Sequence, residues 1–135
     1  MVINRWQSVF LFISGVMMVL GAILPIGFEC IIADNDPASS TCVAIHAIDV
    51  LPIFIIIILA AVNLFLDIFL YKNFRLQKMV NLFGILYIVV AAIIAAIVGC
   101  HLEYIYSGVA LIFAVWARAR INHDEKLLKS YDRIR

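Results

Sequence analysis

The residues of this chain that could do chemistry are few, and the most unusual is a carboxylate inside an apolar stretch. Asp67 follows Asn63 by four positions, so a helix would carry both side chains on one face. A carboxylate inside a membrane is costly and needs a partner, unless it binds a proton or an ion. We expect a structural role, an intramembrane polar clasp that joins three helices through Asn63, Asp67, Asn81 and Arg118. A proton or ion site at Asp67 is the alternative.

Cysteine offers a second kind of chemistry. Cys30 and Cys42 flank a loop rich in turn-forming residues, and Cys100 is the third cysteine. We expect a disulfide between Cys30 and Cys42, which would stabilise a compact loop by on the order of 3 kcal/mol. Two free thiols are the alternative. A quinone-linked disulfide oxidoreductase also has four spans and outer cysteines, but such enzymes commonly carry a CxxC pair, which this chain lacks.

Metal and cofactor sites lack the residue spacing that they require. His46 and His101 stand alone, and the motifs CxxC, HxxxH and HExxH are absent from the sequence. A single histidine beside a helix start, such as His101, is typical of a capping or interface residue. We therefore predict no catalytic residue, no metal and no cofactor, and we expect that the protein is not an enzyme.

Four apolar blocks must position these residues. Hydrophobic residues make up 66% of the 135 residues and charged residues 14%, against roughly half and a quarter in soluble domains. A hydrocarbon core of about 30 Å needs about 20 helical residues. The sequence therefore predicts an all-α membrane protein, a four-helix bundle with spans over residues 6–27, 50–71, 79–99 and 103–121.

The positions of the basic residues predict the orientation of the bundle. All ten Lys and Arg precede the first span, fall between the second and third, or follow the fourth. The other two connections carry only acidic charges, so the positive-inside rule places both termini and the middle connection in the cytoplasm. We expect the first block to be a retained helix and not a cleaved signal peptide, because no small-residue cleavage site follows Pro25.

The connections divide the chain into a transmembrane domain, residues 1–121, and a cytoplasmic tail, residues 122–135. Turn-forming residues at 34–37 give no reason to expect a folded subdomain in the outer loop, residues 28–48. Asn122 is expected to begin a fresh helix in the tail. The weak apolar stripe of that helix would lie on the inner leaflet or dock on a partner, and it consists of Leu127, Leu128, Tyr131 and Ile134.

Two features predict contacts with other molecules besides the lipid bilayer. Ala91, Ala95 and Gly99 are spaced by four, which indicates a close helix contact, either within the bundle or between protomers. We also predict a cytoplasmic interaction surface, made of Lys72, Arg75, Lys78, Asp124, Glu125, Lys126, Arg133 and Arg135. The expected partner is another protein or a second copy of the chain, and we expect no nucleic acid.

Three segments carry a resemblance to a known family. They are NRWQSVFL, FLYKNFRLQ and ARARINHDEKLLKSYDRIR, and they resemble the NRIQS, FLYKNRKLQ and DEKLVRSADRLR patterns of the domain-of-unknown-function 4293 family. The chain departs from the pattern at Phe74 and at Tyr131, where a small residue is common. The resemblance implies a small four-span protein of the inner membrane of Bacteroidetes-type bacteria. It implies no activity, because the family has no assigned active site.

The function that the sequence favours is a non-enzymatic accessory or scaffold subunit of an inner-membrane assembly. The spans lack catalytic motifs, and the family-like residues gather on the cytoplasmic side. The alternative is a small dimeric transporter with Asp67 as the coupling carboxylate. Against this alternative, the four spans show no internal repeat, and Asp67 lies away from the midplane.

Overall fold

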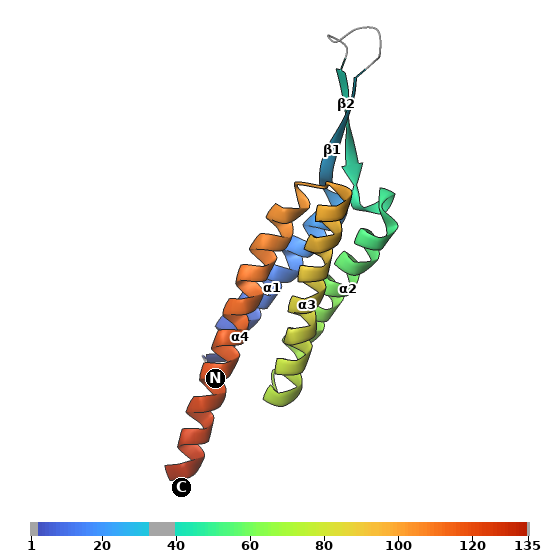
Figure 1. Ribbon diagram of the computed structural model, residues 1–135. Helices are drawn as coiled ribbons and strands as arrows, with labels where there is room; N and C mark the ends of the chain where they lie inside the picture. Colours follow the sequence, from blue (N-terminus) through green and yellow to red (C-terminus); the bar gives the residue numbers. More distant parts are fainter. Residues whose placement is uncertain (1–2, 33–39, 135) are drawn as a thin grey trace.

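The computed structural model describes residues 3–32 and 40–134 and shows four long helices with a hairpin at one end (Figure 1). The elements, in chain order, are α1 (Ile3–Ile23), β1 (Pro25–Ile32), β2 (Ser40–His46), the short 3₁₀ helix η1 (Ala47–Asp49), α2 (Leu51–Phe69), α3 (Phe74–Val98) and α4 (Glu103–Ile134). All four long helices are long and apolar enough to cross a membrane. The predicted four-helix membrane protein is confirmed, and the chain is a multi-pass membrane protein.

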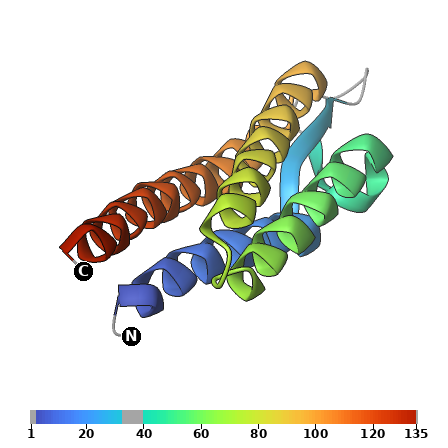
Figure 2. The ribbon, with the colours of Figure 1, turned by 90° about the horizontal axis from the view of Figure 1, so that it is seen from below.

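The four helices pack as a closed ring in which each helix touches the next. Helix α1 packs against α2 and α4, and α3 packs against the other sides of α2 and α4, as the view from below shows (Figure 2). Leu11, Ile57, Leu64 and Ile88 are fully or almost fully buried in the centre. Large apolar side chains also cover the outside of the ring, which is the surface that a bilayer would contact.

Small residues bring the helices close together. Ala91 and Ala95 of α3 are fully buried, so this part of the predicted small-residue stripe faces the inside of the bundle. Gly15 lies against the Phe65 ring, and a Cβ placed at Gly84 would lie 3.2 Å from Leu64 Cδ2. Close approach of this kind maximises the van der Waals contacts that hold helices together in lipid.

The hairpin between α1 and α2 corrects two expectations. The first span does not run to residue 27, because α1 ends at Ile23, and the outer loop does contain folded structure. Pro25 cannot continue a helical hydrogen-bond pattern, and the residues after it form an antiparallel pair with β2. The turn-forming residues at 34–37 lie outside the described residues. The hairpin stands away from the helices at the end of the bundle opposite the C-terminus (Figure 1), and we call this the hairpin end.

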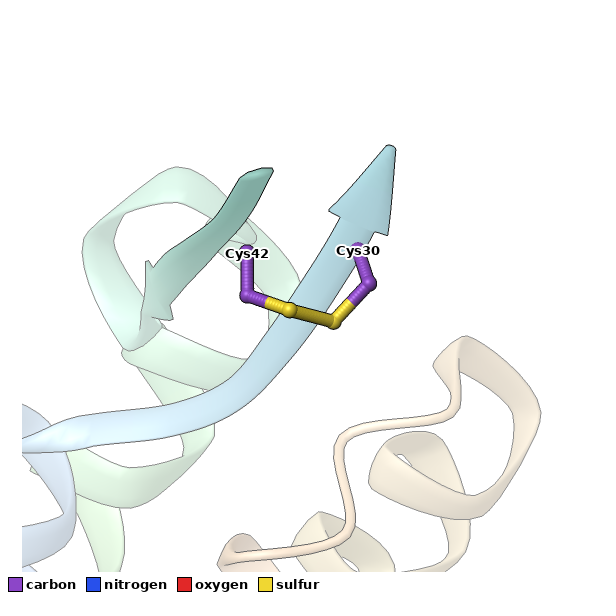
Figure 3. Close-up of a disulfide and its surroundings, with 2 residues drawn as sticks. All are labelled: Cys30 and Cys42. Carbon is purple, nitrogen blue, oxygen red and sulfur yellow. A yellow bond between two sulfur atoms is a disulfide. The ribbon is translucent and has the colours of Figure 1, made fainter. Parts of the chain in front are cut away.

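The two strands are joined covalently. Cys30 and Cys42 are directly opposed in the register of the hairpin, and a disulfide links them (Figure 3). At the base of the hairpin, the Leu102 N–H donates to the Ile26 carbonyl at 2.9 Å. A Cβ at Gly27 would lie 3.3 Å from the Cα of Cys100, so the first strand rests closely on the turn between α3 and α4.

The opposite end of the bundle also differs from the expectations. Helix α3 begins at Phe74 and not at residue 79, so Arg75 and Lys78 belong to a helix and the turn before them spans only residues 70–73. The prediction that a new helix begins at Asn122 is wrong, because α4 continues without a break to Ile134. No Gly or Pro follows Gly108, so nothing in the sequence interrupts the helix. We call this end, with residues 70–78 and the C-terminal part of α4, the basic end.

The close contact at Gly84 gives a first prediction. Gly84→Val should lower the melting temperature in detergent, because the added side chain would push α2 and α3 apart at Leu64. Overpacking of this kind typically costs about 1–3 kcal/mol. Gly108→Val in α4 is the matched control, since a Cβ there would meet nothing within 4 Å. Equal losses of melting temperature in the two variants would contradict the close contact.

Candidate functional site at the basic end

Polar side chains line the contact between α2 and α3 near the basic end. Asn63 and Asp67 lie four apart on α2, while Gln77, Asn81 and Gly84 share one face of α3. The two faces meet, because a Cβ at Gly84 would lie 3.5 Å from Asn63 Oδ1. We call the set Asn63, Asp67, Gln77 and Asn81 the polar seam.

The polar seam is buried and poorly satisfied. Asp67 and Asn81 are fully buried and Gln77 is 1% exposed, while Asn63 is half-buried. Among the described residues, no hydrogen-bond partner exists for either Asp67 oxygen, either Asn81 amide atom, Asn63 Oδ1 or Gln77 Oε1. Most buried polar atoms in proteins are paired, so a group of unpaired atoms in one place calls for a physical reason.

Asp67 of α2 and Asn81 of α3 are both fully buried, and neither side chain has a hydrogen-bond partner among the described residues. Arg118 Nη1 donates to the Lys78 carbonyl at 3.1 Å, which ties α4 to α3. The hydrogen bond of Arg118 thus goes to the backbone of α3, and none of the described residues forms a hydrogen bond with the Asp67 carboxyl, so the predicted clasp stays a prediction.

Two contacts fix α4 where it leaves the bundle. Gln7 Nε2 donates to the Asp124 carboxylate, and both residues are at most 4% exposed. Lys78 forms an ion pair with Glu125, which also pairs with Lys129 at 2.9 Å. Helix α4 is therefore held to α1 by one contact and to α3 by the other.

These contacts change the predicted interaction surface. Asp124 is buried, and Glu125 and Lys78 are half-buried partners of each other, so these three residues hold the bundle together. Sequence reasoning missed Gln7 and Gln77, because polar residues near a span end usually face water. The exposed members of the predicted surface are Lys72, Arg75, Lys126 and Arg133, while Arg135 lies outside the described residues.

Aromatic rings mark the level at which α1 and α4 approach the basic end. The Phe10 ring centroid lies 6.3 Å from that of Trp6, 6.1 Å from Phe113 and 6.0 Å from Trp116. Trp6 and Trp116 are more than half exposed. Tryptophan is enriched at membrane interfaces, so this cluster indicates where the apolar part of the bundle ends and the projecting part of α4 begins.

A second buried carboxylate lies at the hairpin end and was not singled out as a site from the sequence. Glu103, the first residue of α4, is fully buried, and neither of its carboxyl oxygens has a hydrogen-bond partner among the described residues. Its Oε2 would lie 3.1 Å from a Cβ at Gly21, which explains why α1 has a glycine there. Burial, and then the nearby Glu103, raise the pKa of the Cys100 thiol, so this cysteine stays protonated and unreactive at neutral pH.

The histidines take local structural roles. The His46 N–H donates to Asp49 Oδ2 at 3.0 Å, and His46 Nδ1 lies 3.3 Å from the Ile23 carbonyl oxygen. The His101 ring lies 6.3 Å from the Tyr104 ring. Within residues 3–32 and 40–134, no group of three or more His, Cys, Asp or Glu side chains lies together in a way that could hold a metal ion.

Comparison with known proteins identifies a family but no activity. The family model described as Domain of unknown function (DUF4293) matches residues 3–134, which include all four helices and the hairpin. No curated protein matches the chain, and no solved structure does. The three segments that resemble this family lie in α1, at the turn between α2 and α3, and in α4, so all three lie at or near the basic end.

The ion pair between α3 and α4 gives a second prediction. A double-mutant cycle of Lys78→Met and Glu125→Gln should show a coupling of about 0.2–1 kcal/mol in the free energy of unfolding, because both side chains are partly exposed. The coupling should fall as salt is added. Lys129→Met is the control, because its pair with Glu125 lies within one helix. A cycle without coupling between positions 78 and 125 would show that the pair does not hold α4 to α3.

Proposed function

We propose that this chain, which belongs to the DUF4293 family, is a non-enzymatic accessory or scaffold subunit of a bacterial inner-membrane assembly. In the proposed orientation the basic end faces the cytoplasm and the hairpin end faces outward. All ten Lys and Arg lie in the first turn of α1, at the start of α3 with the turn before it, or in the sequence from Arg118 onward. This distribution supports the orientation through the positive-inside rule. A disulfide in the hairpin is consistent with an oxidising outer compartment.

The observation that carries the proposal is the length of α4. The helix runs on past the turn between α2 and α3 (Figure 1). Residues 122–134 cover roughly 20 Å at 1.5 Å per residue. Because the helix does not bend at Asn122, this part would project from the membrane surface and not lie along it. From Lys126 onward every described residue of the helix is exposed, so this part offers its surface to a partner.

The projecting part of α4 has an apolar stripe that no other described residue covers. Leu128 is 50% exposed, Tyr131 70% and Ile134 83%. Tyr131 and Ile134 are three apart, and Leu128 is three before Tyr131, so each of these side chains neighbours the next on the helix surface. Exposed apolar residues at this spacing are typical of helices that dock into a groove or onto another helix.

The charges around the stripe indicate the chemistry of the partner. Lys126 and Arg133 are exposed on the same projecting helix, and Lys72, in the turn between α2 and α3, and Arg75, at the start of α3, are exposed at the same end of the bundle. A partner with an apolar groove and acidic residues at its rim would complement these groups. The contacts of Gln7 with Asp124 and of Lys78 with Glu125 hold α4 in a fixed direction, which lowers the entropy lost on docking.

A pair of substitutions on the apolar stripe tests the scaffold role. Tyr131→Glu combined with Ile134→Glu should abolish co-purification of the partner from native membranes, because each buried anchor of an interface typically contributes about 2 kcal/mol or more. The four helices should remain folded by circular dichroism. Ser130→Ala is the matched control on the same helix, since the Ser130 hydroxyl donates to the Leu127 carbonyl one turn earlier within α4. A partner that stays bound to the double variant, or a lone monomer from wild-type cells, would reject the role.

Transport is the second candidate function, and the unpaired state of Asp67 favours it. The Asp67 carboxyl is fully buried and has no hydrogen-bond partner among the described residues. Groups of this kind exchange protons or ions in membrane proteins. Proteoliposomes with the wild-type protein should then show proton or sodium flux under an imposed gradient. Asp67→Asn should abolish this flux, while Asn73→Asp, which adds a carboxylate at the exposed turn, should not alter it. Vesicles in which the wild type carries no flux would reject transport.

A further inference from the structure

An open hollow lies between α1 and α4 at the level of the aromatic rings. It has a volume of about 440 Å³ and is lined by Phe10 of α1 and by Trp116, Ala119, Arg120 and His123 of α4. The four residues of α4 follow one another at helical spacing, so their side chains share one face. Sites for small ligands commonly have volumes of about 300–1,000 Å³. We call this site the interface hollow.

The part of the interface hollow that faces the membrane interior is aromatic. The ring centroids of Phe10 and Trp116 lie 6.0 Å apart, and the Phe113 ring lies 5.8 Å from Trp116 and edge-on to it. Trp116 is nevertheless 54% exposed. The small side chain of Ala119 is also exposed and leaves the space beside the indole open. A hydrocarbon chain could lie there in van der Waals contact with the rings.

The part of the interface hollow nearer the basic end is cationic. Arg120 follows Trp116 by four residues, so it lies roughly 6 Å further along the helix axis. Arg120 is exposed, and none of the described residues forms a hydrogen bond or an ion pair with its guanidinium. Arg118, by contrast, donates to the Lys78 carbonyl. The exposed imidazole of His123 adds a second group that can donate a hydrogen bond.

The carboxylates nearest in sequence to the interface hollow are engaged elsewhere. Asp124 is buried and accepts from Gln7, and Glu125 pairs with Lys78 and Lys129. Neither carboxylate lines the hollow. The hollow therefore offers a positive charge with no acidic side chain beside it to bind an ammonium group. Its electrostatic complement is a molecule with an anionic end and an apolar end.

The two parts of the hollow are separated by a distance that matches the layers of a bilayer. Tryptophan is enriched at the boundary of the hydrocarbon, and Trp6 and Trp116 are both more than half exposed at this level. The headgroup region extends roughly 5–8 Å beyond the hydrocarbon on each side. Arg120 lies roughly 6 Å beyond Trp116, so it lies in the layer that contains the lipid phosphates.

We propose that the interface hollow binds one phospholipid with an anionic headgroup from the leaflet at the basic end. The Arg120 guanidinium donates two parallel hydrogen bonds to the phosphate, the geometry in which arginine favours this group. The upper part of an acyl chain packs on Phe10 and Trp116, over Ala119. A choline headgroup is disfavoured, because its ammonium group brings a second positive charge close to Arg120.

This inference goes beyond the scaffold role and beyond transport. It requires no protein partner and no flux, and it holds whichever way the chain crosses the membrane, because both leaflets contain phospholipid. The interface hollow is also distinct from the apolar stripe of Leu128, Tyr131 and Ile134. The test therefore measures lipid binding to the purified full chain.

The experiment measures headgroup selectivity with the full chain in detergent. Phosphatidylglycerol should raise the melting temperature in a saturable way and more than phosphatidylcholine with the same acyl chains. Native mass spectrometry should retain phosphatidylglycerol on the chain. Arg120→Gln should weaken its binding about tenfold or more, the loss expected when a hydrogen bond to a charged group is removed. Arg133→Gln removes the same charge at an exposed position further along α4 and should bind like the wild type.

A second variant tests the shape of the hollow without a change of charge. Ala119→Leu would fill the space beside Trp116, so binding of phosphatidylglycerol should weaken. The melting temperature without lipid should stay at the wild-type value, because position 119 is exposed. Ala96→Leu, at an exposed position of α3 towards the hairpin end, is the matched control and should bind like the wild type.

Four outcomes would overturn the proposal. Equal stabilisation by the two lipids would show that the headgroup is not recognised. Equal losses in Arg120→Gln and Arg133→Gln would show a general attraction between anionic lipid and a basic helix. Equal binding by Ala119→Leu and Ala96→Leu would place the lipid elsewhere, and this comparison decides if Arg120→Gln does not fold. Glycerol phosphate that stabilises as strongly as phosphatidylglycerol would show that no acyl chain is bound.

Discussion

The low polarity of the bilayer is the constraint on which the rest of this structure depends. In hydrocarbon an unpaired polar group is unfavourable, so the polar side chains of the spans turn towards other helices. Ser14, Asp67 and Asn81 are fully buried, whereas Phe69 is 77% and Ile97 80% exposed. The Ser14 hydroxyl donates to the Ala110 carbonyl at 2.8 Å and so joins α1 to α4. The bundle thus gathers its polar groups in its interior, and the glycines at 15, 21 and 84 let the helices close around them.

The two ends of the bundle are held together by different contacts. At the hairpin end the chain is closed on itself, because the Cys30–Cys42 disulfide joins the strands and the Leu102 N–H ties the first strand to the turn before α4. At the basic end α4 is fixed by its contacts with α1 and α3 and then leaves the bundle. The covalently closed end suits an exposed outer surface, and the projecting end suits recognition. The proposed scaffold role draws on this asymmetry.

The spans could be predicted from the sequence because hydropathy and length decide them, and the basic residues mark one end. The hairpin could not be predicted, because residues 25–32, PIGFECII, resemble a continuation of the apolar helix before them. They form a strand only because they pair with β2. The continuity of α4 was missed because Asn122 followed by Asp124 and Glu125 resembles a helix start. Asp67 and Asn81 could be paired from the sequence only through their similar depth in the membrane. The burial of Gln77 and Glu103 was missed, because burial at the end of a span depends on which neighbours pack there.

The central claim is that α4 is one straight helix that leaves the membrane at the basic end and presents its apolar stripe to water or to a partner. Spin labels at single positions from 112 to 134, in the full chain reconstituted in vesicles, test it most directly. We expect a change from oxygen-accessible to water-accessible labels near residue 121, with labels at 128, 131 and 134 accessible to a water-soluble relaxation agent. Labels at those three positions that stay oxygen-accessible and protected from that agent would show that the segment lies on the leaflet, which would contradict the claim.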